Sequence, residues 1–134
     1  MASNYTTNYQ LNQWEKTDRI LMDDFNADNQ KIDTALAARN CRFYTSTYNG
    51  TGEAEATFAF PGKPILIVIS SASMVSIAVR GAEYGNTLIP NGFYQFKSTW
   101  SEKSVLFTNT NNDPLISANL KTRTYGMFAI LEAE

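Results

Sequence analysis

Histidine is absent from this chain of 134 residues, and cysteine occurs once, at Cys41. Without histidine the chain can form neither a Ser/His/Asp nor a Cys/His nucleophilic pair, and it lacks the commonest zinc ligand. A single cysteine can form neither an internal disulfide nor a cysteine-rich metal site. We therefore expect no metal, no other cofactor and no disulfide framework. Cys41 itself is expected to be a small buried side chain.

Positive charge and long apolar runs are scarce as well. Lys and Arg total 11 against 13 Asp and Glu, a net charge of -2, whereas non-specific nucleic-acid binding requires a positive excess. No apolar run approaches the roughly 18 residues of a membrane-spanning helix. The polar start of the chain lacks the apolar core of a secretory signal. We expect neither a nucleic-acid partner nor membrane insertion, and synthesis in the cytoplasm without a signal peptide.

Glycine and proline are confined to one part of the chain. All seven glycines lie at or beyond Gly50, and all four prolines lie at or beyond Pro61. These two residue types mark turns, so their placement divides the chain into residues 1–39 and residues 40–134. The composition is that of a folded protein, with 43% hydrophobic and 18% charged residues.

The first segment predicts one long helix. Asn12 is a candidate N-cap, with Glu15 three residues on as in a capping box. Heptad spacing of apolar residues then continues for about 26 residues. A helix of that length with one narrow apolar stripe needs a partner, so we predict a parallel coiled-coil stalk between identical chains; the alternative is a helix packed on its own domain. The predicted oligomerisation residues are Leu11, Trp14, Asp18, Leu21, Phe25, Asp28, Ile32 and Ala35.

Two acids, Asp18 and Asp28, interrupt the apolar heptad positions. Buried carboxylates are costly unless they are paired or neutralised. They either lie partly exposed and break the stripe, or form polar layers that set register and the number of chains. Arg19 and Lys31 are close enough in sequence to pair with them, and the sequence leaves both explanations open.

The second segment predicts about seven short antiparallel strands. Phe58 and Phe60 are expected to face inward, and so are Val75, Ile77 and Val79. Residues 65–69 and 125–131 are apolar on both faces, which is typical of strands covered on both sides. With Asn-Gly and Pro-Gly turn signals between the strands, this pattern predicts a β-sandwich. The expected class is α+β, with the long helix and the sandwich segregated along the chain.

Two stretches resemble tail proteins of phages and prophages of Gram-positive gut bacteria. Residues 6–14, 24–29 and 31–33 resemble an N-terminal segment of such proteins. Residues 44–52, which end in Tyr-Asn-Gly-Thr-Gly at 48–52, followed by 58–60 and 63–67, are similar to the small β-domain that ends many tail fibres. The order Lys63-Pro64 is inverted relative to that pattern.

The resemblance implies a homotrimeric tail-fibre or receptor-binding protein with a helical stalk and a β-sandwich tip. Such a protein resides in a virion tail or a prophage-derived particle. It would recognise a bacterial surface polysaccharide or other tail proteins, and it would not be an enzyme. The rival functions are a structural tail subunit that binds only other tail proteins and a glycan-cleaving tail enzyme.

A glycan-binding surface needs aromatic faces for the sugar ring and amides or acids for its hydroxyls. For each candidate the alternative is a core or interface aromatic, or a turn-forming asparagine. No two carboxylates are spaced to predict the acid pair of a glycosidase. The candidates are Tyr84, Asn86, Asn91, Tyr94, Trp100, Asn111 and Asp113.

Overall fold

The computed structural model describes residues 1–39 and 41–133, and the chain divides into two compact units. We call residues 1–39 the helical unit and residues 41–132 the β domain. Among the described residues, no helix combines the length and the apolar character needed to cross a membrane.

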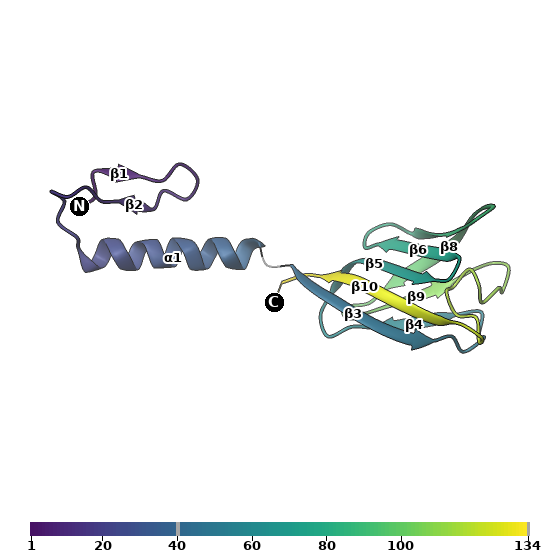
Figure 1. Ribbon diagram of the computed structural model, residues 1–134. Helices are drawn as coiled ribbons and strands as arrows, with labels where there is room; N and C mark the ends of the chain where they lie inside the picture. The colour runs from purple at the N-terminus through teal and green to yellow at the C-terminus, as the bar shows by residue number, and fades with distance from the viewer. Residues whose placement is uncertain (40, 134) are drawn as a thin grey trace. The chain divides into compact units, whose positions relative to one another are not determined.

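The helical unit holds a short hairpin and one helix. The hairpin joins β1 (Asn4–Tyr5) to β2 (Asn12–Gln13), and α1 spans Met22–Arg39 (Figure 1). Gln10, at a φ of 54°, turns the chain back between the two strands. Asp23 and Asp24 lie in the first turn of α1, where the helix dipole favours negative charge.

The prediction of one long helix, and with it the coiled-coil stalk, is therefore wrong. The helix has 18 residues and begins at Met22, nine residues later than expected. Asn12 is not a helix cap but part of β2, and four of the predicted oligomerisation residues precede the helix. These four are Leu11, Trp14, Asp18 and Leu21.

The two acids that interrupt the heptad pattern make contacts inside this unit instead. The Asp18 carboxylate accepts hydrogen bonds from the hydroxyl of Ser3, from Glu15 N and from Ser3 N, and these lower its pKa. Burial of Asp28 raises its pKa, but the N–H of Asn12, at 2.9 Å, together with the Asn12 side chain and Lys31, outweighs burial and leaves the pKa below 3.8. Asp28 thus ties β2 to α1.

One apolar face of α1 is exposed to solvent. The side that contains buried Asp28 and half-buried Ala35 is the covered one. Phe25, Ile32 and Leu36 are 55%, 41% and 65% exposed, and at 3.6 residues per turn they form a stripe about a quarter turn from that side. This helix buries polar side chains and exposes apolar ones.

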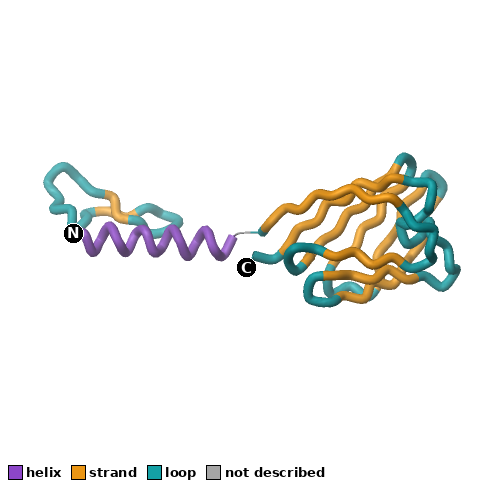
Figure 2. The backbone as a smooth tube through the Cα atoms, turned by 90° about the horizontal axis from the view of Figure 1, so that it is seen from below, coloured by secondary structure: helices purple, strands orange, loops and turns teal. Residues whose placement is uncertain are grey.

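The β domain is a single eight-stranded antiparallel sheet that curls around its own core (Figure 2). The order is β3-β10-β5-β6-β7-β8-β9-β4, so the predicted sandwich of two sheets is wrong. The edge strands still approach each other, because the rings of Tyr48 on β3 and Phe58 on β4 are 5.1 Å apart. The strands are β3 (Arg42–Asn49), β4 (Ala56–Ala59), β5 (Pro64–Ser71), β6 (Met74–Val79), β7 (Tyr84–Ile89), β8 (Gly92–Trp100), β9 (Ser104–Thr108) and β10 (Thr124–Leu131).

The core fills the inside of the curl with aromatic and aliphatic side chains. Phe107 contacts Phe96 and Phe58, with ring centroids 4.1 and 5.1 Å apart. Phe58 and Phe60 face inward as predicted. Each such side chain stabilises the fold by about 1.5–3 kcal/mol when it is fully buried.

The inward face of β6 is the opposite of the predicted one. Ser76 and Ala78 are buried, while Ile77 and Val79 face outward and are exposed. The Ser76 hydroxyl lies 2.7 Å from Thr87 Oγ1, and Thr87 donates to Ile116 O. Because these hydroxyls satisfy one another inside, the polar residues of β6 can face the core and its aliphatic residues can face outward.

Two tyrosines, the half-buried Tyr48 and the buried Tyr125, make the β domain sensitive to alkali. Burial raises the pKa of Tyr48 above 10.0, with a further contribution from Tyr125, whose own pKa burial also raises. Tyr48 donates to Ala118 O at 2.6 Å. A tyrosine in the unfolded chain ionises near pH 10, whereas these two tyrosines stay neutral there in the folded chain. Their contribution to the free energy of unfolding is therefore complete below pH 10 and is lost as the pH rises above 10.

We therefore expect the urea concentration at the midpoint of unfolding to decrease as the pH rises above 10. Tyr48→Phe should cost about 1 kcal/mol at neutral pH, because one hydrogen bond is lost. It should also flatten the alkaline decline. A wild-type midpoint that stays constant through the range of tyrosine ionisation would contradict the assignment.

Candidate functional site

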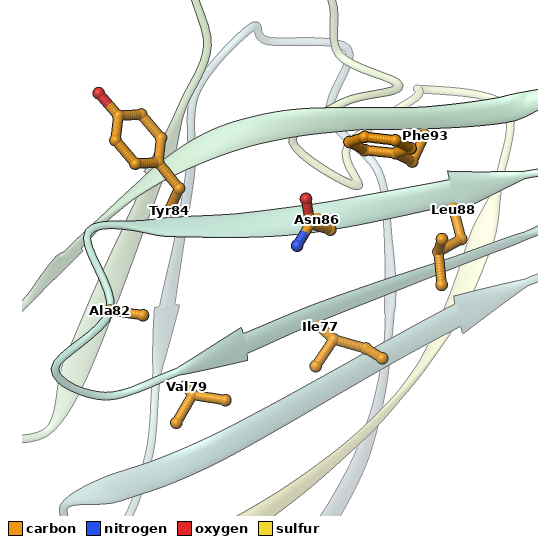
Figure 3. Close-up of a pocket in the computed structure, with 7 residues that line it drawn as sticks. All are labelled: Ile77, Val79, Ala82, Tyr84, Asn86, Leu88 and Phe93. Atoms are coloured by element: carbon orange, nitrogen blue, oxygen red, sulfur yellow. The ribbon is translucent and has the colours of Figure 1, made fainter.

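The outer face of the sheet carries a shallow depression over β6, β7 and the start of β8. Its volume is about 410 Å³. Figure 3 shows Tyr84, Asn86 and Leu88 projecting from β7, with Ile77 and Val79 from β6 beside them. Except for the Asn86 amide and the Tyr84 hydroxyl, this depression is apolar.

A second, more polar hollow adjoins it and shares Tyr84. Its volume is about 330 Å³, and Gln95, Lys97 and Thr108 line it. The strand register places Tyr84 opposite Lys97, Lys97 opposite Thr108, and Asn86 opposite Gln95. We call these five residues, Tyr84, Asn86, Gln95, Lys97 and Thr108, the polar shelf.

The chemistry of the polar shelf suits a hydroxylated ring. Tyr84 is 51% exposed and offers an aromatic face to C–H groups. The amides of Asn86 and Gln95 can donate and accept hydrogen bonds. The Lys97 amine lies 3.4 Å from Glu83 Oε1, so the cation is partly balanced but remains exposed. This set can bind a neutral or weakly acidic sugar.

Of the predicted glycan residues, only Tyr84 and Asn86 lie on the polar shelf. Asn91 lies in the turn between β7 and β8, and Asn111 is exposed in the loop after β9. Tyr94 alternates with Gln95 and so faces the opposite side of β8.

Trp100 and Asp113 have structural contacts. Trp100 packs against the core, donates to Ser98 Oγ at 3.1 Å and lies under the Arg80 guanidinium, 5.0 Å from it. Asp113 Oδ1 accepts from Leu115 N at 2.9 Å, which is a turn contact. These two side chains are used within the fold.

The sequence pattern does not predict Gln95, Lys97 and Thr108 as site residues. Alternation along β8 was the available signal, since Phe93, Gln95 and Lys97 share one side of that strand. The sequence pattern does not predict the strand β7, because its Gly85-Asn86 pair is typical of a turn. Without β7 the register that joins Tyr84 to Lys97 could not be drawn.

Cys41 is exposed, so the prediction that it is buried is wrong. Among the residues that the structure describes, no three His, Cys, Asp or Glu side chains gather in a way that could hold a metal ion.

No protein-family model, curated protein or solved structure matches this chain.

Proposed function

We propose that this chain is a self-associating attachment protein of a phage-like tail, a homotrimer whose β domain binds a bacterial surface glycan through the polar shelf without cleaving it. The observation that carries the proposal is the exposed Tyr84 ring between the amide of Asn86 and the amine of Lys97 on one open face. The resemblance of residues 6–14 and 48–52 to tail proteins supports the setting.

Self-association compensates for weak glycan binding at a single polar shelf. One shelf offers a single aromatic and a few hydrogen-bonding groups, which suits a weak sugar contact. Several copies held together raise the effective concentration of the remaining sites once one has bound. The uncovered stripe of α1, at Phe25, Ile32 and Leu36, shows that the helical unit has apolar surface available for contact with another chain. This role does not need a long stalk.

An array of bacterial surface polysaccharides, including anionic cell-wall polymers, tests the proposal with the full chain. We expect Tyr84→Ala and Lys97→Gln each to weaken binding by about tenfold or more, equivalent to about 1.4 kcal/mol. Tyr5→Ala removes an equally exposed tyrosine from the helical unit, and Lys103→Gln removes an exposed lysine outside the shelf. Both controls should bind like the wild type.

Two outcomes would overturn the proposal. Equal losses in the controls and the shelf variants would remove the shelf as the site. A wild-type chain that binds no polysaccharide on the array would favour a subunit that contacts only other tail proteins.

A further inference from the structure

The outer side of five adjacent strands carries no charged residue. The register aligns Phe128, Val68 and Ile77 in one row across β10, β5 and β6. On β3, β10, β5, β6 and β7 every outward position is apolar or an uncharged polar residue. We call the large apolar side chains of this surface, together with one from β8, the apolar sheet face: Phe43, Leu66, Val68, Val75, Ile77, Val79, Leu88, Phe93, Phe128 and Ile130.

Much of this surface is open to solvent. Phe43 and Phe93 are 70% and 62% exposed, and Val79 is 47% exposed. The exposed parts of the ten side chains amount to roughly 700 Å², more than the roughly 300–600 Å² of the largest patch on a typical monomer. The total is close to the roughly 800 Å² that each partner contributes to a stable interface.

The sequence of β5 is typical of a strand that is covered on both faces. Ile67 and Ile69 on β5 are fully buried inside the curl, while Leu66 and Val68 face outward. Antiparallel sheets with one solvated face alternate apolar and polar residues, and continuous aliphatic strands occur where both faces are buried.

We propose that the apolar sheet face is the surface through which the β domains of the homotrimer pack together, with each copy turning this face toward its neighbours around the threefold axis. The inference deepens the proposed function, on which it rests for self-association, by naming the surface. A face without charge offers nothing to select a charged partner. Exposed apolar area of this size matches one side of a stable interface.

The charges next to this face favour a second copy as well. At the strand ends Lys63 lies 2.8 Å from Glu132, and Lys97 lies 3.4 Å from Glu83. Because these cations and anions are paired within the chain, identical surfaces can approach without like charges facing each other. The two surfaces adjoin at Ile77 and Leu88, which line one depression with Tyr84 and Asn86. Packing centred on β3, β10, β5 and β6 leaves Gln95, Lys97 and Thr108 of the polar shelf free for glycan.

Thiol labelling of the full chain tests the surface directly. In a Cys41→Ser background, Ile77→Cys places a thiol on the apolar sheet face, and Thr99→Cys places one outward on β8, beyond it. Both positions are exposed within one chain. In the associated protein we expect the thiol at position 77 to react with a soluble maleimide about tenfold or more slowly than the thiol at position 99. Dilution to the monomer should abolish the difference.

A second pair of variants measures the association. Ile77→Lys should weaken self-association, followed by sedimentation over a range of concentrations, by about tenfold or more, because it places an unpaired charge in the interface. Thr99→Lys adds the same charge outside the face and should leave the association unchanged. Circular dichroism verifies that both variants are folded, and the labelling experiment does not depend on Ile77→Lys folding.

The outcomes separate this surface from the proposed function. A wild-type chain that remains a 15.0 kDa monomer at all concentrations overturns the interface. An oligomer in which both thiols react equally fast also overturns it, and places the association elsewhere, while glycan binding by the shelf can still hold. Slow labelling at position 77 with weaker association of Ile77→Lys supports it, whatever the polysaccharide array shows.

Discussion

Replacing Asn119 with aspartate is expected to lower the free energy of unfolding of the β domain by about 4 kcal/mol. Asn119 is buried, and its amide nitrogen donates to Thr51 Oγ1, Glu53 O and Glu55 O at 2.8–3.1 Å. Its oxygen accepts from Thr51 N at 2.9 Å. A carboxylate keeps the acceptor but loses the donor, so a buried negative charge would face the carbonyl oxygens.

Urea denaturation of the full chain, followed by circular dichroism, measures this effect. Asn111→Asp is the matched control, because it makes the same chemical change at an exposed loop position and should stay within about 0.5 kcal/mol of wild type. The deficit of Asn119→Asp should shrink in acid, since a protonated carboxyl is neutral and can donate one hydrogen bond. A loss no greater than that of the control would show that this network does not hold the segment 51–55.

Gly85→Ala is expected to cost about 3 kcal/mol. A methyl group at Gly85 would lie 2.3 Å from the Phe96 ring and 2.7 Å from Ile77 O. The ring cannot easily move away, because Phe96 is buried and its centroid lies 4.1 Å from that of Phe107. The effect is steric, and the β6–β7 contact must open to accommodate it.

Gly126→Ala provides the comparison for this prediction. Gly126 is also a strand glycine, but a methyl group there would meet only Ser70 Oγ, at 3.8 Å. We expect it to be neutral or to stabilise by about 0.5 kcal/mol, because alanine loses less backbone freedom on folding. Combining Gly85→Ala with Phe96→Leu should cost less than the sum of the two single changes. Strict additivity would contradict the ring clash.

The two predictions concern the frame that presents the polar shelf. Gly85 stands between Tyr84 and Asn86. A shift of β7 that relieves the clash with Phe96 would therefore displace both. Asn119 holds the segment between β3 and β4, and its side-chain hydrogen bonds go to Thr51, Glu53 and Glu55, none of which belongs to the polar shelf. Glycan binding should therefore fall with Gly85→Ala even under conditions where the protein is still folded. It should persist with Asn119→Asp for as long as the β domain remains folded.

Local pattern predicted those elements in which one face is clearly apolar. Alternation alone predicted the inward Phe58 of β4 and Phe60 directly after it, because Glu55 and Thr57 mark the solvent side. The lack of histidine and the single cysteine excluded their chemistries without reference to any fold. The turn-rich composition after Gly50 indicated the part of the chain that is rich in strands, although β3 already begins at Arg42.

Tertiary structure decided the rest, because alternation cannot tell which side of a strand is inside when both sides can be buried. On β6, the inward Ser76 hydroxyl is satisfied by Thr87 Oγ1, eleven residues on, which accepts its hydrogen bond and donates to Ile116 O. On α1, the Asp28 carboxylate accepts a hydrogen bond from the N–H of Asn12, sixteen residues away, so that β2 packs on the helix and is not part of it. The polar shelf exists only in the register of β7, β8 and β9, since it takes side chains from three strands that no local spacing relates.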